Sequence, residues 1–232
     1  MGVADLPPDT TQPSAASRQQ PGATGNRFAE SGRVEAFSDG VFAVAITLLV
    51  LGLKAPVHRG MMLHDLLAQW PAYVAYLASF AYVGVIWVNH HQLFTRIARV
   101  NAGLLWRNLA LLLTTSVLPF PTAVVGSAFQ LGQRGDESAA LIFYAATGAT
   151  TAATWLLLFH FLSRAPQLLE DEDHAIFFGR ERQRAVVGIL LYAASGLCAL
   201  RYPAAGLAIA CILPVFYSVT SAGMRSAGTR QA

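Results

Sequence analysis

The sequence predicts an all-α membrane protein with six transmembrane helices. Hydrophobic residues make up 54% of its 232 residues and charged residues only 12%. A typical soluble domain has about 25% charged residues. Six apolar segments approach the length of roughly 20 residues that a helix needs to cross a bilayer. Most Lys and Arg residues lie in the terminal tails and in every second connection between these segments, as in proteins that cross a membrane several times.

The third of these segments contains the sequence LPFPT at residues 118–122. This sequence predicts a hinge or a kink, because Pro cannot donate a helical hydrogen bond. Only Arg201 and Tyr202 separate the fifth segment from the sixth, so a tight helical hairpin with Pro203 at a helix start is expected. The predicted spans are residues 35–53, 70–90, 102–129, 139–162, 185–200 and 203–219.

We expect one six-helix transmembrane domain over residues 31–222, between two cytoplasmic tails. Residues 1–30 are rich in Pro, Gly, Ser, Thr and Gln, which is typical of a disordered segment, and a second short tail covers residues 223–232. With the N-terminus inside, twelve of the 16 Lys and Arg residues are cytoplasmic. This distribution obeys the positive-inside rule and predicts a multi-pass protein of the cell membrane with both termini cytoplasmic. The four basic residues left outside are Lys54, Arg59, Arg134 and Arg201.

The first predicted helix carries an apolar stripe and a polar face. On a helical wheel with about 100° per residue, Thr47, Leu48 and Leu51 fall within about 60° of Val44. Ser38 and Asp39 fall outside this stripe. The stripe could pack against neighbouring helices or line a pore, and spacing alone does not decide between these roles.

A carboxylate such as Asp39 is costly inside a membrane unless it has partners. We interpret Ser38 and Asp39 as part of a polar contact that orients the first helix; a proton relay or an ion-binding carboxylate is the alternative. His90 and His91 could instead bind a metal or sense pH, but adjacent residues on a helix point about 100° apart. Candidate partners at the same depth are Asn89, His90, His91, Asn101, Arg107 and Asn108.

Three strings of the sequence resemble the transmembrane protein 175 family of potassium channels, in its prokaryotic branch with one six-helix unit per chain. They are RVEAFSDGVFAVAITLLVL, YVGVIWVNHHQLF and RNLALLLTTSVLPFPT. The resemblance covers roughly residues 33–122 with specific motifs, and the rest of the chain only by helix count. The family's FSDG motif is intact at residues 37–40, and the preceding basic residue matches Arg33.

The resemblance implies a homotetramer in which four copies of the first helix line the ion path. By this likeness Val44, Leu48 and Leu51 form aliphatic constriction rings, and Thr47 forms a hydroxyl ring that binds K⁺ transiently. The family often has a bulkier aliphatic residue in place of Val44, which leaves open which ring is tightest. The polar residues hold helices together in this family and do not bind the ion, which implies a structural network of Arg33, Ser38, Asp39, His90, His91, Asn101 and Arg107.

The sequence therefore predicts a homotetrameric channel that passes K⁺ passively and needs no cofactor. A proton-coupled secondary transporter that uses Asp39 and a histidine is the main alternative, and a non-conducting membrane scaffold is another. No catalytic motif is present, and the net charge of +3 without a basic stripe argues against nucleic-acid binding. The acidic run EDEDH at residues 170–174 reads as a solvated loop, with calcium binding as a weak alternative.

Overall fold

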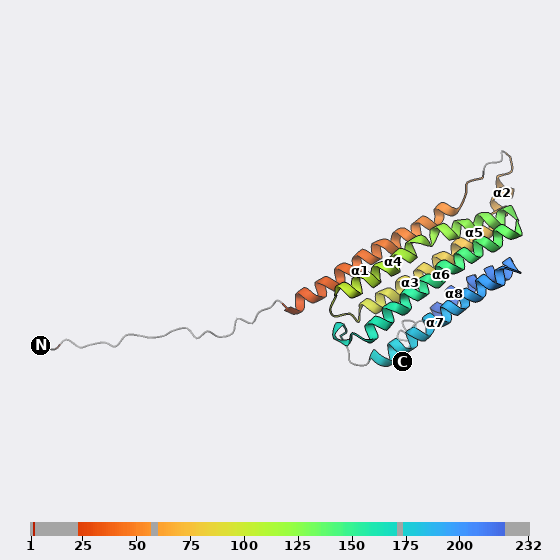
Figure 1. Cartoon of the computed structure of the whole chain (residues 1–232). Helices are drawn as coiled ribbons and strands as arrows, with labels where there is room; N and C mark the ends of the chain where they lie inside the picture. Colours follow the sequence, from red (N-terminus) through yellow and green to blue (C-terminus); the bar gives the residue numbers. More distant parts are fainter. Residues whose placement is uncertain (1, 3–22, 57–59, 171–173, 221–232) are drawn as a thin grey trace, which may run out of the picture.

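The structure is a computed structural model that describes residues 2, 23–56, 60–170 and 174–220, and its long helices run side by side as a bundle (Figure 1). Two short 3-10 helices, η1 and η2, continue α1 and follow α6. The elements are α1 (Ala23–Leu48), η1 (Leu49–Gly52), α2 (Met62–Ala68), α3 (Trp70–Phe94), α4 (Ala102–Val117), α5 (Pro119–Leu131), α6 (Arg134–Ser163), η2 (Pro166–Leu168), α7 (His174–Ala199) and α8 (Pro203–Thr220).

The helix α1 begins at Ala23, inside the segment that was expected to be a disordered tail. Ala, Arg and Glu residues at 23–35 have good helix propensity, which permits this extension. Residues 3–22 of the expected N-terminal tail and residues 223–232 of the expected C-terminal tail lie outside the described residues.

Five stretches of helix in the described residues are long and apolar enough to cross a membrane: 31–52, 70–94, 102–131, 134–162 and 203–220. The helix α7, predicted as the fifth of six spans, does not reach this standard. Its first half carries Arg180, Arg182 and Arg184, and its apolar part is short because the helix ends at Ala199. The fold is all-α with several membrane-length helices, and α7 packs against both α6 and α8.

The LPFPT sequence divides the third predicted span into α4 and α5 without turning the chain away. Leu118 between them keeps right-handed helical angles, with φ −50° and ψ −36°. Its N–H donates to Thr115 O at 3.1 Å, and Thr122 N donates to Leu118 O at 3.2 Å. Because Pro119 and Pro121 lack an N–H, the helical hydrogen bonds are interrupted here. The backbone nevertheless stays helical from α4 into α5.

Local signals explain several helix ends. The side chain of Asn101 accepts a hydrogen bond from Leu104 N at 2.8 Å and so caps α4. Gly132 ends α5 with φ 68°, a left-handed conformation that Gly adopts without steric cost. The predicted hairpin at Arg201 and Tyr202 is confirmed, since α7 ends at Ala199 and α8 begins at Pro203.

The position of α1 in the bundle matters most for the site. This helix packs against α3 and α4, whereas α7 and α8 lie at the opposite edge (Figure 1). At the end of the bundle where α3 and α6 finish, the loop after α3 meets η2 through hydrogen bonds such as Ala98 N to Leu168 O at 2.8 Å. One edge of the bundle is therefore formed by α1, with one of its faces left without cover from its own subunit.

Candidate functional site

The helix α1 has two distinct faces. Ser38, Phe42, Ala45 and Leu49 recur at helical spacing and are almost fully buried, where α1 packs against α3 and α4 and η1 packs against α5 and α3. These residues anchor α1 to the bundle. Their burial fixes the rotation of α1 about its own axis, and with it the direction of every other side chain on the helix.

The predicted stripe lies on the other face of α1 and is exposed. Val44 is 56% exposed, Leu48 41% and Leu51 75%, and Thr47 is also exposed. The stripe lies beside a shallow groove of about 470 Å³ that Phe37, Val44 and Leu48 help to line. Leu51 lies in η1 and not in α1 proper, yet it also points away from the bundle. The stripe is thus not used for packing within the subunit.

Thr47 holds its hydroxyl in a defined orientation. Its Oγ1–H donates to Val44 O at 2.9 Å, a local bond within α1. The proton is therefore directed toward the helix backbone, and the lone pairs of the oxygen remain available on the exposed side. An oxygen held in this way can accept a hydrogen bond or coordinate a cation.

A chain of hydrogen bonds joins α1, α4 and α3 behind this stripe. Ser38 Oγ donates to Val34 O at 2.8 Å and accepts from Asn108 Nδ2 at 2.9 Å. His90 Nε2 lies 2.9 Å from Asn108 Oδ1. Since Asn108 Oδ1 can only accept, the network assigns the imidazole proton to Nε2. Ser38, His90 and Asn108 are all buried, so these hydrogen bonds are shielded from solvent.

The ring of His90 is enclosed by apolar neighbours. It stacks on Phe94 with ring centroids 4.3 Å apart and meets the edge of Phe42 at 5.0 Å. Within the described residues its Nδ1 atom is buried without a hydrogen-bond partner. This setting favours a role in packing and orientation.

Two carboxylates of α1, those of Glu35 and Asp39, contact α3 along a second, more exposed line. Trp87 Nε1 donates to Asp39 Oδ1 at 3.0 Å, and His91 Nδ1 lies 2.7 Å from Glu35 Oε1. The rings of Trp87 and His91 stack with centroids 6.3 Å apart. The partners on each helix are four residues apart and so lie on one helix face. Two side-chain contacts, one from an indole and one from an imidazole to a carboxylate, therefore join α1 to α3.

The remaining residues of the predicted network lie elsewhere. Asn101 caps α4, and Arg107 Nη1 donates to Gly103 O at 2.8 Å while its guanidinium lies 4.1 Å above the centre of the Phe161 ring. Arg33 is exposed. The structure therefore brings Ser38 and His90 together through Asn108, places Asp39 and His91 beside them, and leaves Asn101, Arg107 and Arg33 outside this contact.

Sequence reasoning missed a second buried hydrogen-bond cluster. Ser79 on α3 lies 2.7 Å from Thr122 Oγ1 on α5 and 3.1 Å from Tyr144 Oη on α6. These small polar residues are spread over three apolar segments. No local pattern marks them, because only the packing of the helices brings them together.

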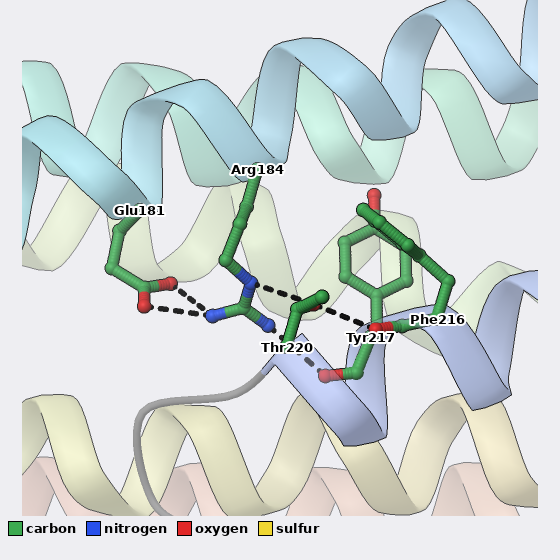
Figure 2. Close-up of polar contacts among 5 residues, drawn as sticks. All are labelled: Glu181, Arg184, Phe216, Tyr217 and Thr220. Atoms are coloured by element: carbon green, nitrogen blue, oxygen red, sulfur yellow. Dashed lines mark hydrogen bonds and ion pairs between the residues drawn. The ribbon is translucent and has the colours of Figure 1, made fainter. Parts of the chain in front are cut away.

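A buried ion pair on α7 was also missed (Figure 2). Arg184 Nη1 donates to Glu181 Oε1 at 2.7 Å, and its Nε and Nη2 donate to Thr220 Oγ1 and Tyr217 O, each at 3.1 Å. The pair joins α7 to the last turn of α8. The spacing of Glu and Arg three residues apart is a usable signal for such a pair.

Within the described residues, no group of three or more His, Cys, Asp or Glu side chains is arranged to hold a metal ion. Three of the five residues in the acidic run, Asp171 to Asp173, fall outside those residues. The geometry offers an exposed apolar surface with one hydroxyl, backed by a rigid polar contact. That arrangement suits passage of an ion along α1.

Comparisons with known proteins assign the family. Residues 33–119 match the family described as "Endosomal/lysosomal potassium channel TMEM175". A potassium channel of Streptomyces collinus is 42% identical over 165 residues, which cover 70% of this chain and 79% of that protein. The crystal structure of a lysosomal potassium-selective channel TMEM175 homolog from Chamaesiphon minutus has 30% identity and a TM-score of 0.73, covering 84% of this chain and 99% of that one.

A more distant relative carries a different description. The human endosomal/lysosomal proton channel TMEM175 is 30% identical over 181 residues, which cover 71% of this chain and 36% of the human protein. The resemblance seen in the sequence motifs is confirmed by these matches. The chain belongs to the TMEM175 family, a family of membrane channels and not of enzymes.

Proposed function

We propose that the protein conducts K⁺ passively through a pore formed by the first helices of four subunits. The observation that carries this proposal is the direction of Val44, Thr47 and Leu48, which face away from their own subunit. Because α1 lies at one edge of the bundle, a single subunit cannot enclose a path. Closed rotational symmetry brings identical surfaces together around an axis. The potassium-channel relatives support K⁺ as the permeant ion.

In this arrangement the stripe supplies two kinds of ring. Val44, Leu48 and Leu51 form aliphatic rings, which can close a path by excluding water. We expect the tightest ring at Leu48, whose side chain is larger than that of Val44. Thr47 supplies four hydroxyl oxygens whose lone pairs are not committed to its own helix. These oxygens replace part of the hydration shell of K⁺ and bind it weakly enough for release.

The six-span topology with both termini cytoplasmic belongs to the same proposal. The helix α7 then serves as the fifth of the six spans, although its apolar part is short. It crosses the membrane packed between α6 and α8, and its arginines remain at the cytoplasmic side. The hydrogen bonds of Ser38, Asn108 and His90 hold α1 at the rotation that turns the stripe toward the axis.

Proton movement is the second candidate. The human relative is described as a proton channel, and the pair of Glu35 and His91 joins two titratable groups on α1 and α3 at 2.7 Å. By contrast, Asp39 bonds to the indole of Trp87, and His90 bonds to Asn108. The predicted relay between Asp39 and a histidine therefore has less geometric support than passive conduction.

Recordings in a planar bilayer separate these functions. The purified protein is placed between two solutions that contain K⁺ and Na⁺ in opposite ratios, first at equal pH and then with a pH gradient across the bilayer. A K⁺ channel gives currents that reverse near the K⁺ equilibrium potential. Currents that follow an imposed pH gradient and ignore K⁺ would favour proton conduction, and absence of current would favour a scaffold. The native mass in detergent is expected to be four times the subunit mass of 24.8 kDa.

A further inference from the structure

A groove of about 850 Å³ lies between α6 and α7, toward the end of the bundle where α6 finishes and α7 begins. Leu156 and Leu157 on α6 and Val186 and Val187 on α7 form its apolar part. His160 and Arg182 lie about one helical turn closer to that end of the bundle. The groove thus combines an apolar length with a basic end.

The apolar part of the groove is open at the surface of the bundle. Leu157 is 60% exposed, Val186 42% and Val187 40%. Gly179 lines the basic end, and a Cβ atom built on it would meet nothing within 4 Å. An elongated apolar group could lie along this surface without displacing any side chain of the subunit.

Among the described residues, no carboxylate pairs with the basic end of the groove. His160 lies within electrostatic range of Arg164 and Arg182. In the part of the chain that the structure describes, none of these three side chains forms an ion pair with a carboxylate. The acidic run before α7 starts with Glu170, whose backbone N–H donates to Arg96 O in the loop after α3. The next three residues of this run lie outside the described ranges.

The buried pair on α7 explains why the outer face stays basic. Glu181 lies between Arg180 and Arg182 in the sequence, but its side chain turns inward and binds Arg184 (Figure 2). Its side chain is only 9% exposed. The carboxylate that could have neutralised Arg182 is therefore used inside the bundle.

The groove lies far from the surface proposed to form the pore. It is built by α6 and α7, whereas α1 packs against α3 and α4 at the other edge (Figure 1). With α1 at the axis of an assembly, the groove faces the surrounding lipid. The positive-inside orientation places its basic end at the cytoplasmic leaflet, where anionic lipid headgroups are found.

We propose that this groove binds an anionic phospholipid of the cytoplasmic leaflet. Arg182 and His160 contact the phosphate of the headgroup, and one acyl chain lies along Leu157 and Val186. Basic pockets between transmembrane helices on the cytoplasmic side recognise anionic headgroups by this chemistry. The assignment of the groove to the cytoplasmic leaflet rests on the membrane orientation given under the proposed function. The lipid site itself does not depend on ion conduction.

The test measures lipid retention without any ion flux. The full chain is purified in detergent, and binding of phosphatidylglycerol and phosphatidylcholine is measured by native mass spectrometry. Wild-type protein is expected to retain phosphatidylglycerol in preference to phosphatidylcholine. Arg182→Gln is expected to weaken phosphatidylglycerol binding about fivefold, the effect of one arginine near an anionic lipid. The matched control is Arg99→Gln, which removes an exposed arginine at the same end of the bundle and should change binding less than about twofold.

A second variant tests the groove itself. Gly179→Leu is expected to fill the open space and to lower retention of phosphatidylglycerol, with the melting temperature and subunit number unchanged. Equal retention of the two lipids by the wild type, or an equal loss in Arg182→Gln and Arg99→Gln, would overturn the proposal. A change in subunit number for Gly179→Leu without a change in lipid retention would overturn it as well, because the groove would then be a contact between subunits.

Discussion

Asn108 on α4 donates its side-chain N–H to the hydroxyl of Ser38 on α1 at 2.9 Å, across 70 positions of sequence. The same amide accepts from His90 on α3, so one buried residue connects three helices. Breaking one bond of such a network is destabilising, because each polar group that loses its partner in an apolar interior is costly. The direction of the exposed stripe of α1 depends on this connection.

Replacing Asn108 by Leu is expected to destabilise the subunit. The substitution leaves the Nε2–H group of His90 without an acceptor, and an unsatisfied buried donor costs about 1–3 kcal/mol. Thermal unfolding in detergent, followed by intrinsic fluorescence, should show a lower midpoint. Ser116→Ala is the control, since that exposed hydroxyl donates to Leu113 O on its own helix and lies outside the network. Equal midpoints for the Asn108 variant and the wild type would contradict a structural role for this network.

Asp39→Asn is expected to keep both assembly and ion selectivity. The indole N–H of Trp87 donates to Asp39 Oδ1 at 3.0 Å, and an amide oxygen can accept the same bond. Asp39→Ala removes the acceptor and should lower the fraction of intact assemblies, as measured by native mass. Ion flux through Asp39→Asn is then recorded with and without a pH gradient. Loss of flux in this variant, with assembly intact, would point to a proton-coupled transporter.

The helices themselves were largely predictable from the sequence. The span predicted at residues 70–90 is α3 at Trp70–Phe94, and the span at residues 203–219 is α8 at Pro203–Thr220. Long apolar runs that end at Pro or charged residues define such helices locally. The helix α2 was not predicted, because its seven residues, Met62–Ala68, form no long apolar run. The helix α7 was predicted as a span, but its apolar part is too short to count among the membrane-length helices of the described residues.

The site was predictable only in part, because depth in the membrane does not give the rotation of a helix. Asn101 and Arg107 were predicted at the level of Ser38, but Asn101 caps α4 and Arg107 turns toward Phe161 on α6. The wheel of α1 grouped Val44, Thr47 and Leu48 on one stripe but did not decide what this stripe faces, and the structure answers that by burying Phe42 on the other side of the helix. Contacts between distant segments, such as Ser79 with Tyr144, leave no periodic pattern in the sequence.

Thr47→Val is expected to lower the preference for K⁺ over Na⁺. Val has nearly the shape of Thr but lacks the oxygen that Thr47 presents beside its bond to Val44 O. Loss of one weak polar contact of about 1 kcal/mol corresponds to roughly a fivefold change in an equilibrium. The reversal potential under a K⁺/Na⁺ gradient should therefore move toward zero.

The control for this substitution lies on another helix. Thr150 on α6 is exposed and bonds to Ala146 O in the same local manner, at 2.8 Å. Thr150→Val should leave the reversal potential unchanged, because this residue is not on the stripe of α1. Unchanged selectivity in Thr47→Val, with normal conductance, would count against the hydroxyl ring.

Removing either partner of the buried pair of Glu181 and Arg184 is expected to destabilise the bundle strongly. Arg184→Met leaves a carboxylate that is 9% exposed without its cation, and breaking a buried pair in this way costs about 3–5 kcal/mol. The substitution also removes the donors to Tyr217 O and Thr220 Oγ1, so the last turn of α8 should become less protected from amide hydrogen exchange.

The double variant Glu181→Leu with Arg184→Met should recover part of the lost stability, because it leaves no unpaired charge. The control Arg180→Gln changes an exposed residue and should cost little stability. If the double variant were as unstable as the sum of the two single variants, the two side chains would not be energetically coupled, and the inward turn of Glu181 would need another cause.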